Sequence, residues 1–430
     1  MKILIKNGHV VDPAQKIDGV MDVLARDGLI VEVGKSISSE GAQVYDASGK
    51  IVMPGLVDMH VHLREPGRED KETILSGTKA ALKGGFTCVL AMPNTMPAID
   101  SVENARLLRR LIEKDACIDV LVCAAITRGR KGQELVDISV LKKEGIVAVS
   151  DDGCSVEDAH LMAEVLKIAG HENIAVICHC EDKSLSGDGV INLGFVSTQL
   201  GLRGISRESE YRRVERDVQL AASSRVPVHI AHVSTRESVD IIASAKQKGV
   251  RVTAETAPHY FTLTDEDVLD YDTNMKMNPP LRELDDVKAI KKALKDGVID
   301  VIASDHAPHT ENEKEIEFDR AEFGVIGLET SLSIAAAKLV DEKVLDWKGL
   351  VEKMALNPAR ILGVKKGALE PGRRADIVIF DPHLEWVVEK KDFVSLSKNS
   401  PFIGRSLKGK TERVFFGGKL VYDNGVFIGK

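Results

Sequence analysis

Residues 53–64 read Met53-Pro54-Gly55-Leu56-Val57-Asp58-Met59-His60-Val61-His62-Leu63-Arg64, an apolar run that ends in two histidines one residue apart. Side chains alternate between the two faces of a β-strand, so His60 and His62 are expected to point the same way. Two imidazoles on one face at the end of a buried strand form half of a metal site. The pair alone also fits two ordinary core or surface histidines, and the rest of the chain decides between these interpretations.

The composition is that of a globular protein without a basic surface. The chain has 430 residues, of which 43% are hydrophobic and 29% charged, and its formal net charge is −8. It is too long for a single small domain. Nothing indicates nucleic-acid binding, and the short basic run 128–132 is predicted to be a solvated loop. No apolar run is long enough to span a bilayer, and residues 1–8 lack a signal-peptide core, so we expect a cytoplasmic protein that does not bind membranes.

Short apolar runs rich in β-branched residues alternate with amphipathic segments from about residue 54 to residue 365. Near-continuous apolar strands separated by helices indicate a parallel sheet covered on both faces. The strand–helix units predict an α/β protein built on a (β/α)₈ barrel of the TIM type. A doubly wound open sheet is the alternative, which is disfavoured because no Gly-x-Gly-x-x-Gly turn follows the first strand. The runs are 55–63, 86–94, 118–127, 146–152, 174–181, 226–234, 250–259 and 298–309.

Local signals mark several helix ends. Asp100 and Ser101 precede the amphipathic segment 102–113 as expected N-caps. Gly84-Gly85 and Gly249 each precede a predicted strand, where a C-cap glycine closes a helix.

Both ends of the chain are strand-like. Segments 2–11, 29–33, 51–53 and 375–381 are predicted strands, and 414–422 is a predicted hairpin around Gly417-Gly418. Neither end alone offers much of a core, so we expect the two to pair into one small β-sandwich beside the barrel. The predicted domains are therefore residues 1–53 with 366–430 as the composite sandwich, and residues 54–365 as the barrel.

Polar side chains gather at the carboxyl ends of the predicted barrel strands. These ends form one face of a barrel, so the side chains are expected to converge. Unpaired buried polar groups are costly, which makes core filling a poor explanation for so many at matching positions. The residues are His60, His62 and Arg64 of strand one, Asn94 of strand two, Asp151 and Asp152 of strand four, His179 of strand five, His232 of strand six and Asp305 of strand eight.

The number of ligands predicts a site for two metal ions. His60, His62 and Asp305 suit one ion, His179 and His232 suit the other, and a carboxylate between them would bridge. Nitrogen and carboxylate ligands without thiolate favour zinc, although manganese or cobalt also fits. Ions about 3.5–4 Å apart can share a hydroxide that forms near neutral pH.

Other histidines and cysteines are expected to be structural. Cys178 and Cys180 flank the histidine of strand five, so alternation turns both towards the helices, and the cysteines form no disulfide framework. By the same alternation His229 and His306 should point away from the site. His259 ends strand seven and is left outside the ligand set, because a strand-end position alone is weak evidence.

Together these motifs resemble the cyclic amidohydrolases of the amidohydrolase superfamily, and within that group the dihydroorotases of the long bacterial type. The resemblance covers essentially the whole chain. Its motifs are residues 54–62, His62-Leu63-Arg64-Glu65-Pro66-Gly67, Met92-Pro93-Asn94-Thr95, Ser150-Asp151-Asp152-Gly153, Cys178-His179-Cys180-Glu181-Asp182, His229-Ile230-Ala231-His232-Val233-Ser234, Met277-Asn278-Pro279-Pro280-Leu281-Arg282, Ser304-Asp305-His306-Ala307-Pro308-His309, Asn357-Pro358-Ala359-Arg360 and Leu369-Glu370-Pro371-Gly372.

The resemblance implies reversible interconversion of N-carbamoyl-L-aspartate and L-dihydroorotate, a step of pyrimidine (UMP) synthesis. It implies two zinc ions bridged by Asp152 and a hydroxide, and Asp305 as the catalytic acid and base. A planar arginine suits the substrate carboxylate. One zinc would be held by His60, His62, Asp152 and Asp305 and the other by Asp152, His179 and His232, while the substrate would contact His62, Arg64, Asn94, Asn278, His309 and the backbone of Phe323 and Gly324.

Two other functions share parts of this pattern. Hydantoinases, dihydropyrimidinases and allantoinases use a carboxylated lysine as the metal bridge, and the run 145–152 contains no lysine. Non-catalytic relatives that scaffold aspartate transcarbamoylase would be expected to lack metal ligands, whereas every ligand position is filled here. A homodimer, a complex with aspartate transcarbamoylase and a need for that partner stay open. The charged segment 310–323 fits either a closing lid or a plain surface loop.

Overall fold

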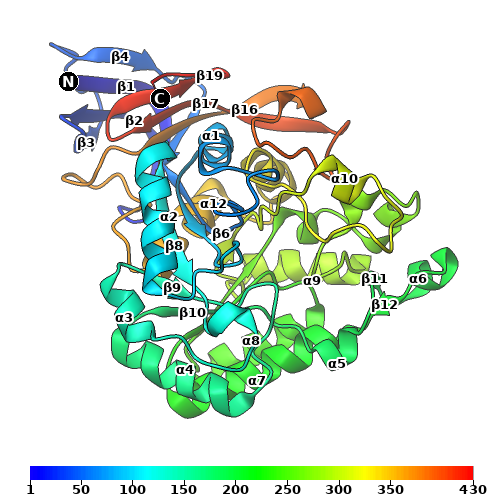
Figure 1. Ribbon diagram of the computed structural model, residues 1–430. Coiled ribbons are helices and arrows are strands. Elements are labelled where there is room, and N and C mark those ends of the chain that lie inside the picture. The colour runs from blue at the N-terminus through cyan, green and yellow to red at the C-terminus, as the bar shows by residue number, and fades with distance from the viewer. Residues whose placement is uncertain (430) are drawn as a thin grey trace.

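The computed structural model describes residues 1–429 and divides them between a barrel and a terminal β-sheet (Figure 1). The barrel sheet has eight parallel strands, one in each predicted apolar run, and neighbours in the chain are neighbours in the sheet apart from the small pair β11–β12. The predicted (β/α)₈ architecture is thereby confirmed. The strands are β6 (Leu56–Val61), β7 (Phe86–Ala91), β8 (Asp119–Ala124), β9 (Ala148–Val149), β10 (Ala175–Cys178), β13 (Val228–Ile230), β14 (Val252–Thr256) and β15 (Val301–Ile302).

The first and last barrel strands meet through a short seam. An isolated parallel bridge joins Val61 to His306, and the His62 N–H donates to the His306 carbonyl at 2.9 Å. Earlier in both segments, the buried Asp58 carboxylate accepts the Ser304 N–H at 3.1 Å. These contacts hold β6 against β15. The predicted metal ligands that come first and last in the sequence are therefore brought together.

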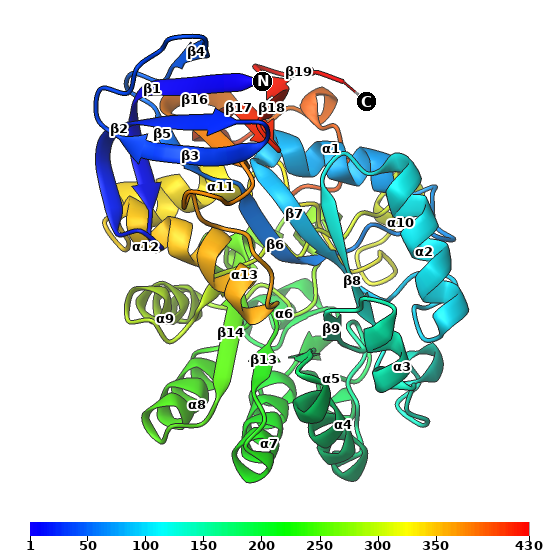
Figure 2. The same ribbon diagram turned by 90° about the vertical axis from the view of Figure 1, so that its left-hand side faces the viewer.

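Helices cover the outside of the barrel, as Figure 2 shows for α4, α7 and α8. The Ser101 side chain accepts the Asn104 N–H as the predicted N-cap, and Gly85 ends the first helix with a φ of 91°. The helices between and after the strands are α1 (Ile74–Gly84), α2 (Val102–Asp115), α3 (Ile138–Lys143), α4 (Ala159–Glu172), α7 (Glu208–Ser224), α8 (Arg236–Gln247), α9 (Leu284–Lys295), α11 (Ser331–Ala335), α12 (Trp347–Val351) and α13 (Asn357–Ile361).

The two termini share one nine-stranded sheet, in which β5 pairs with β16 in antiparallel register. Its strands enclose a hydrophobic cluster of their own that includes Ile5, Val52, Ile377 and Phe415. The flanking β-structure built from both termini is therefore confirmed, and the hairpin turn falls at Gly417-Gly418. The strands are β1 (Lys2–Asp12), β2 (Ile17–Arg26), β3 (Leu29–Gly34), β4 (Gln43–Asp46), β5 (Ile51–Pro54), β16 (Ile377–Val387), β17 (Ser406–Phe416), β18 (Lys419–Asp423) and β19 (Val426–Phe427).

Several hydrogen-bonded strands are shorter than the apolar runs that predicted them. The run 298–309 contains only two ladder residues, because the chain leaves the sheet and turns into the loops that carry the site. Figure 1 shows one such loop region projecting from the barrel with α6 at its end. The loop elements are α5 (Lys183–Ser186), β11 (Ile191–Asn192), α6 (Phe195–Leu200), β12 (Gly204–Ile205) and α10 (Glu311–Lys314).

Over the described residues 1–429, none of the helices combines the length and the apolar character needed to cross a membrane.

Candidate metal centre and substrate cavity

The six predicted metal ligands converge at the carboxyl ends of five barrel strands. His60 lies on β6 and His62 just after it, while the others follow the ends of β9, β10, β13 and β15. All five of His60, His62, Asp152, His179 and His232 are at most 6% exposed. The barrel therefore brings together residues that are up to 245 positions apart in the chain.

Asp152 stands at the centre of this group. Its Oδ1 lies 3.2 Å from His60 Nε2, 3.5 Å from His179 Nδ1 and 3.7 Å from His232 Nε2, and its Oδ2 lies 3.5 Å from His62 Nε2. Asp151, its neighbour, points elsewhere and accepts the N–H groups of Ile126 and Thr127. The carboxylate of Asp152 is thus placed to reach both halves of the predicted ligand set.

The donor atoms fit a metal ion. His60, His62 and Asp305 form one group with donor atoms within 4.8 Å of one another, and His60, Asp152 and His232 form another. His60 Nε2 and Asp152 Oδ1 are buried and have no hydrogen-bond partner, which is costly unless a cation occupies the space between them. Burial opposes ionisation of Asp152, but His60, His179 and His232 outweigh it and hold its pKa well below the ordinary range.

Each of three histidines is held from behind through its other ring nitrogen. His60 Nδ1 lies 2.5 Å from Glu255 Oε1, His62 Nδ1 lies 2.8 Å from Asn94 Oδ1, and His179 Nε2 lies 3.2 Å from Glu181 Oε2. Such contacts fix the orientation and tautomer of an imidazole that binds a metal. The nitrogen left over on each ring faces Asp152.

Two ligand-bearing turns and the Arg64 turn have left-handed backbone. The φ angles of Arg64, His232 and Asp305 are 63°, 34° and 47°. Residues other than glycine adopt this region at a cost and do so mainly at functional sites. Here the chain departs from extended strand geometry at the residues that carry these three side chains.

The metal group forms the floor of a cavity of about 350 Å³. The Arg64 guanidinium is fixed at its wall by the Pro308 carbonyl (3.0 Å) and by His309 Nε2 (3.1 Å). Burial lowers the pKa of Arg64 to about 10, so it stays a cation at neutral pH. Every residue predicted to contact the substrate lines this cavity: His62, Arg64, Asn94, Asn278, His309, Phe323 and Gly324.

The segment 310–323 contributes Glu322 and Phe323 to the cavity wall and is anchored by a buried lysine. Lys314 Nζ donates to the carbonyls of Lys276 (3.3 Å), Glu322 (2.8 Å) and Gly324 (3.1 Å). The Gly324 N–H is itself used by the Lys276 carbonyl. In this structure these contacts hold the segment as part of the cavity wall, and nothing distinguishes the closing lid from the plain surface loop that the sequence also allowed.

Alternation correctly separated some residues from the site. Cys178 and Cys180 join the hydrophobic cluster that contains the outer helices, and Cys180 Sγ contacts Asp217 of α7. His306 turns away and pairs with Glu72 at 3.2 Å. His259 Nε2 has no partner but belongs to neither candidate ligand group, and its ring packs on Tyr260.

The expectation that His229 points away from the site is wrong. His229 is buried, and its Nε2 lies 3.1 Å from Glu255 Oε2, the carboxylate that also holds His60. The alternation rule failed because β13 ends at Ile230 and His232 has a positive φ, so the two histidines are not related by a continuous strand. Glu255 was missed altogether, although a carboxylate inside the apolar run 250–259 was an available signal.

The basic run 128–132 is not simply a solvated loop. Arg130 lines the cavity, and its Nη1 donates to the Asp152 carbonyl at 2.6 Å. Its Nε is buried without a partner. The turn that aims Arg130 inwards depends on a φ of 56° at that residue, which no sequence pattern announced.

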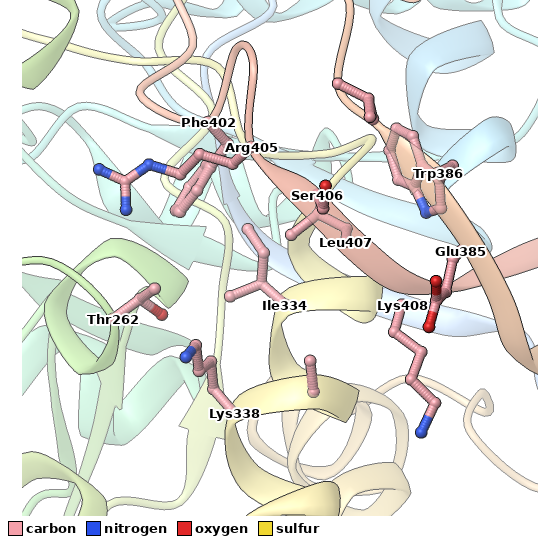
Figure 3. A pocket seen from close by; sticks show the side chains of 12 residues that line it. Thr262, Ile334, Lys338, Glu385, Trp386, Phe402, Arg405, Ser406, Leu407 and Lys408 are labelled. Atoms are coloured by element: carbon pink, nitrogen blue, oxygen red, sulfur yellow. The ribbon is translucent and has the colours of Figure 1, made fainter.

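A larger cavity, about 570 Å³, lies away from the histidines and shares no lining residue with the first. Figure 3 shows it between α11, the following helical turn and strands β16 and β17, with Phe402, Leu407 and Trp386 on its wall. Its three cations are already paired: Arg405 with Asp267 at 2.7 Å, Lys408 with Asp341 at 2.9 Å and Lys338 with Glu342 at 3.3 Å. We assign it no ligand.

Comparison with known proteins places the chain in a family. A model of the family described as "DHOase: Dihydro-orotase-like" matches residues 49–238. A dihydroorotase of Elusimicrobium minutum is 53% identical over 425 residues, which covers 99% of this chain and 98% of that one. A dihydroorotase of Geobacter metallireducens is 52% identical and is covered over its whole length. The chain belongs to the dihydroorotase family.

Solved structures support the same fold for this member of the dihydroorotase family. An L-hydantoinase (dihydropyrimidinase) from Arthrobacter aurescens superposes with a TM-score of 0.90 at 24% identity and covers all of this chain, with 97% of that chain covered. A D-hydantoinase superposes with a TM-score of 0.88 at 26% identity, with the same coverage. The likeness to the first shows a shared barrel architecture and nothing finer.

Proposed function

We propose that this protein is a dihydroorotase, which interconverts L-dihydroorotate and N-carbamoyl-L-aspartate in pyrimidine synthesis. One observation carries the proposal: a chain about half identical to dihydroorotases over nearly its full length gathers all six predicted metal ligands at one cavity. The substrate is a small molecule with a free carboxylate, and Arg64 offers a buried guanidinium on the cavity wall.

The residues present would hold two zinc ions. His60, His62 and Asp305 would hold one, His179 and His232 the other, and Asp152 would reach both. Imidazole and carboxylate donors without thiolate suit zinc. Metal ions bound there would supply Lewis acidity towards the ring amide carbonyl and acidity to an attacking water.

Asp305 is the proposed general base and acid. Its Oδ1 lies 3.2 Å from His62 Nε2. Burial opposes ionisation, but His60, His62 and His232 lower the pKa of Asp305, so it is a carboxylate at neutral pH. In ring opening it takes a proton from the attacking water and returns it to the leaving ring nitrogen. In ring closure the same carboxylate moves the proton in the opposite direction.

The remaining cavity residues orient the substrate. Arg64 binds the substrate carboxylate through two parallel N–H groups. Asn94 accepts from His62 through Oδ1, which leaves its Nδ2 for the substrate. Asn278 donates its Nδ2 to Glu181 at 3.0 Å, so its Oδ1 is free to accept a ring N–H. His309 and the backbone of Phe323 and Gly324 complete the proposed contacts.

We propose that residues 1–53 with 366–430 form one domain and 54–365 the other, and that the protein works in the cytoplasm. A homodimer or a complex with aspartate transcarbamoylase is tested by sedimentation with and without that enzyme.

The test is hydrolysis of L-dihydroorotate by the zinc-loaded protein, with hydantoin and allantoin in parallel and Asp305→Ala as the control. Turnover of dihydroorotate alone, lost in the variant, supports the proposal. Turnover of hydantoin or allantoin instead would overturn the substrate assignment while keeping the metal site. Inactivity on all three would favour a partner-dependent or non-catalytic subunit, and the assay would be repeated with aspartate transcarbamoylase.

A further inference from the structure

A chain of buried polar side chains crosses the barrel interior beneath the candidate metal centre. It starts at His60, whose Nδ1 lies 2.5 Å from Glu255 Oε1. The other oxygen of Glu255, Oε2, lies 3.1 Å from His229 Nε2, and His229 Nδ1 lies 2.8 Å from Thr253 Oγ1. The chain therefore links strands β6, β14 and β13 through side chains alone.

Glu255 lies outside the cavity. It is 1% exposed and is not among the residues that line the cavity, whereas Asn94 and Glu181, which support His62 and His179, both are. A substrate in the cavity would therefore contact the supports of two histidines but not the support of His60. Among the predicted metal ligands, His60 is the one that the Glu255 side chain contacts.

The geometry determines which nitrogen of His60 faces the metal group. A carboxylate accepts hydrogen bonds and does not donate, so the 2.5 Å contact requires the proton on Nδ1. Nε2 then presents its lone pair towards Asp152, 3.2 Å away, and it has no hydrogen-bond partner. A carboxylate in this position also raises the basicity of the ligand nitrogen.

His229 holds Glu255 in turn. A buried carboxylate with one oxygen unpaired would be costly, and the His229 imidazole supplies the second donor. A carboxylate only accepts, so the 3.1 Å contact requires a proton on His229 Nε2, while His229 Nδ1 lies 2.8 Å from Thr253 Oγ1. Both oxygens of Glu255 are thereby fixed.

We propose that Glu255 and His229 are positioning residues of the metal centre, which set the tautomer and orientation of His60 and so its affinity for the metal. This inference rests on the proposed function, because it requires that His60 binds a metal ion.

The chain offers a matched control. Glu72 is also a fully buried carboxylate that contacts a histidine Nε2 at 3.2 Å, in this case His306. His306 directly follows Asp305 but points away from the metal group. Glu72→Gln thus makes the same chemical change in a buried carboxylate–histidine pair that does not support a metal ligand.

The experiment measures zinc binding to the chelator-treated full chain by competition with a chromophoric chelator. Wild type, Glu255→Gln and Glu72→Gln are compared, and circular dichroism checks that each is folded. We expect Glu255→Gln to weaken zinc binding by about 10–100-fold, the usual effect of removing such a partner, and Glu72→Gln to match wild type. The visible spectrum of the cobalt-loaded protein should change in Glu255→Gln and stay unchanged in Glu72→Gln.

A second variant covers the case in which Glu255→Gln does not fold. His229→Leu keeps the contact between Glu255 and His60 and removes the donor behind it, so zinc binding should weaken by less than in Glu255→Gln. Equal zinc affinity in wild type, Glu255→Gln and His229→Leu would overturn the inference alone. Equal losses in Glu72→Gln and Glu255→Gln would also overturn it, because the effect would then be general. A wild type that binds no zinc would overturn the metal centre itself.

Discussion

At the scale of single residues, Arg64 shows how the fold prepares a cation for a substrate carboxylate. The Pro308 carbonyl accepts from Nε and His309 Nε2 contacts Nη2, so the fork is held before a ligand arrives. The φ of 63° turns the chain out of the strand direction at this residue. Sequence indicated the residue type and its place after the first strand, and the tertiary contacts aim it.

We expect Arg64→Lys to raise the KM for L-dihydroorotate by about 30-fold, which corresponds to about 2 kcal/mol for a lost charged hydrogen bond. Lysine keeps the charge but cannot form the planar two-point contact. Steady-state kinetics at matched zinc content measure the effect. An unchanged KM would show that Arg64 does not bind the carboxylate.

Lys314 gives the wall segment 310–323 a pH-dependent stability. It is 3% exposed; burial, and after it Lys276, lower its pKa from 10.5 to about 7, against the raising effects of Asp272, Glu322 and Glu313. The folded state therefore binds fewer protons at this group than the unfolded state does between about pH 7 and 10.5. The contribution of Lys314 to the free energy of unfolding therefore increases as the pH rises from about 7 to about 10.5.

The corresponding variant is Lys314→Met, which keeps the length of the side chain and removes the titrating group. The free energy of unfolding of wild type, measured with urea in chelator, should rise relative to Lys314→Met as pH increases from about 7 to about 9. The comparison removes contributions from other groups. Parallel pH profiles for the two proteins would contradict the assignment.

At the scale of elements, local sequence patterns predicted whether a segment forms a helix or a strand better than they predicted where the element ends. Each apolar run contains a barrel strand, because both faces of these strands are buried and most of their residues are therefore apolar. The ends were missed where site residues continue the run beyond the ladder, as in β15. Strand β4 was missed because its four residues are exposed or half-buried and carry no alternation.

The predicted N-cap at the start of helix α2 can be tested directly. The Ser101 side chain accepts the Asn104 N–H at 3.2 Å at the helix start. We expect Ser101→Ala to lower the free energy of unfolding by about 1 kcal/mol, and Ser101→Asp to retain the cap. Urea denaturation of the three proteins provides the measurement, and equal stability of Ser101→Ala and wild type would refute the role of the cap.

At the scale of the whole molecule, the barrel and the terminal sheet are joined by one continuous piece of chain at each end. Strand β5 pairs with β16 in the terminal sheet and is followed almost at once by β6. Strand β6 carries His60 and leads directly to His62. The opposite end of the barrel meets β6 at the seam between Val61 and His306. Ligands from the first and last barrel strands are therefore adjacent only in the closed fold.

Because its ligands come from five strands, the metal site is expected to stabilise the whole fold. A ligand that binds only the folded state adds about 2.7 kcal/mol at a hundred times its dissociation constant. Zinc should therefore raise the thermal midpoint of the chelator-treated protein in a concentration-dependent way, and Asp152→Ala should respond much less. Differential scanning calorimetry with increasing zinc tests this, and an equal rise in both proteins would argue against the site.

The sequence by itself predicted the barrel, the β-structure shared by the termini and a candidate ligand set, because burial periodicity and the residue types at strand ends can be read locally. The choice of Asp152 as the bridge came from the family resemblance. Tertiary structure alone decided which groups Glu255, His229 and Arg130 contact. Their partners lie on other strands or loops, and the positive φ values at His232 and Arg130 end the alternation from which their directions could have been inferred. Contacts across a barrel depend on closure, which no local pattern encodes.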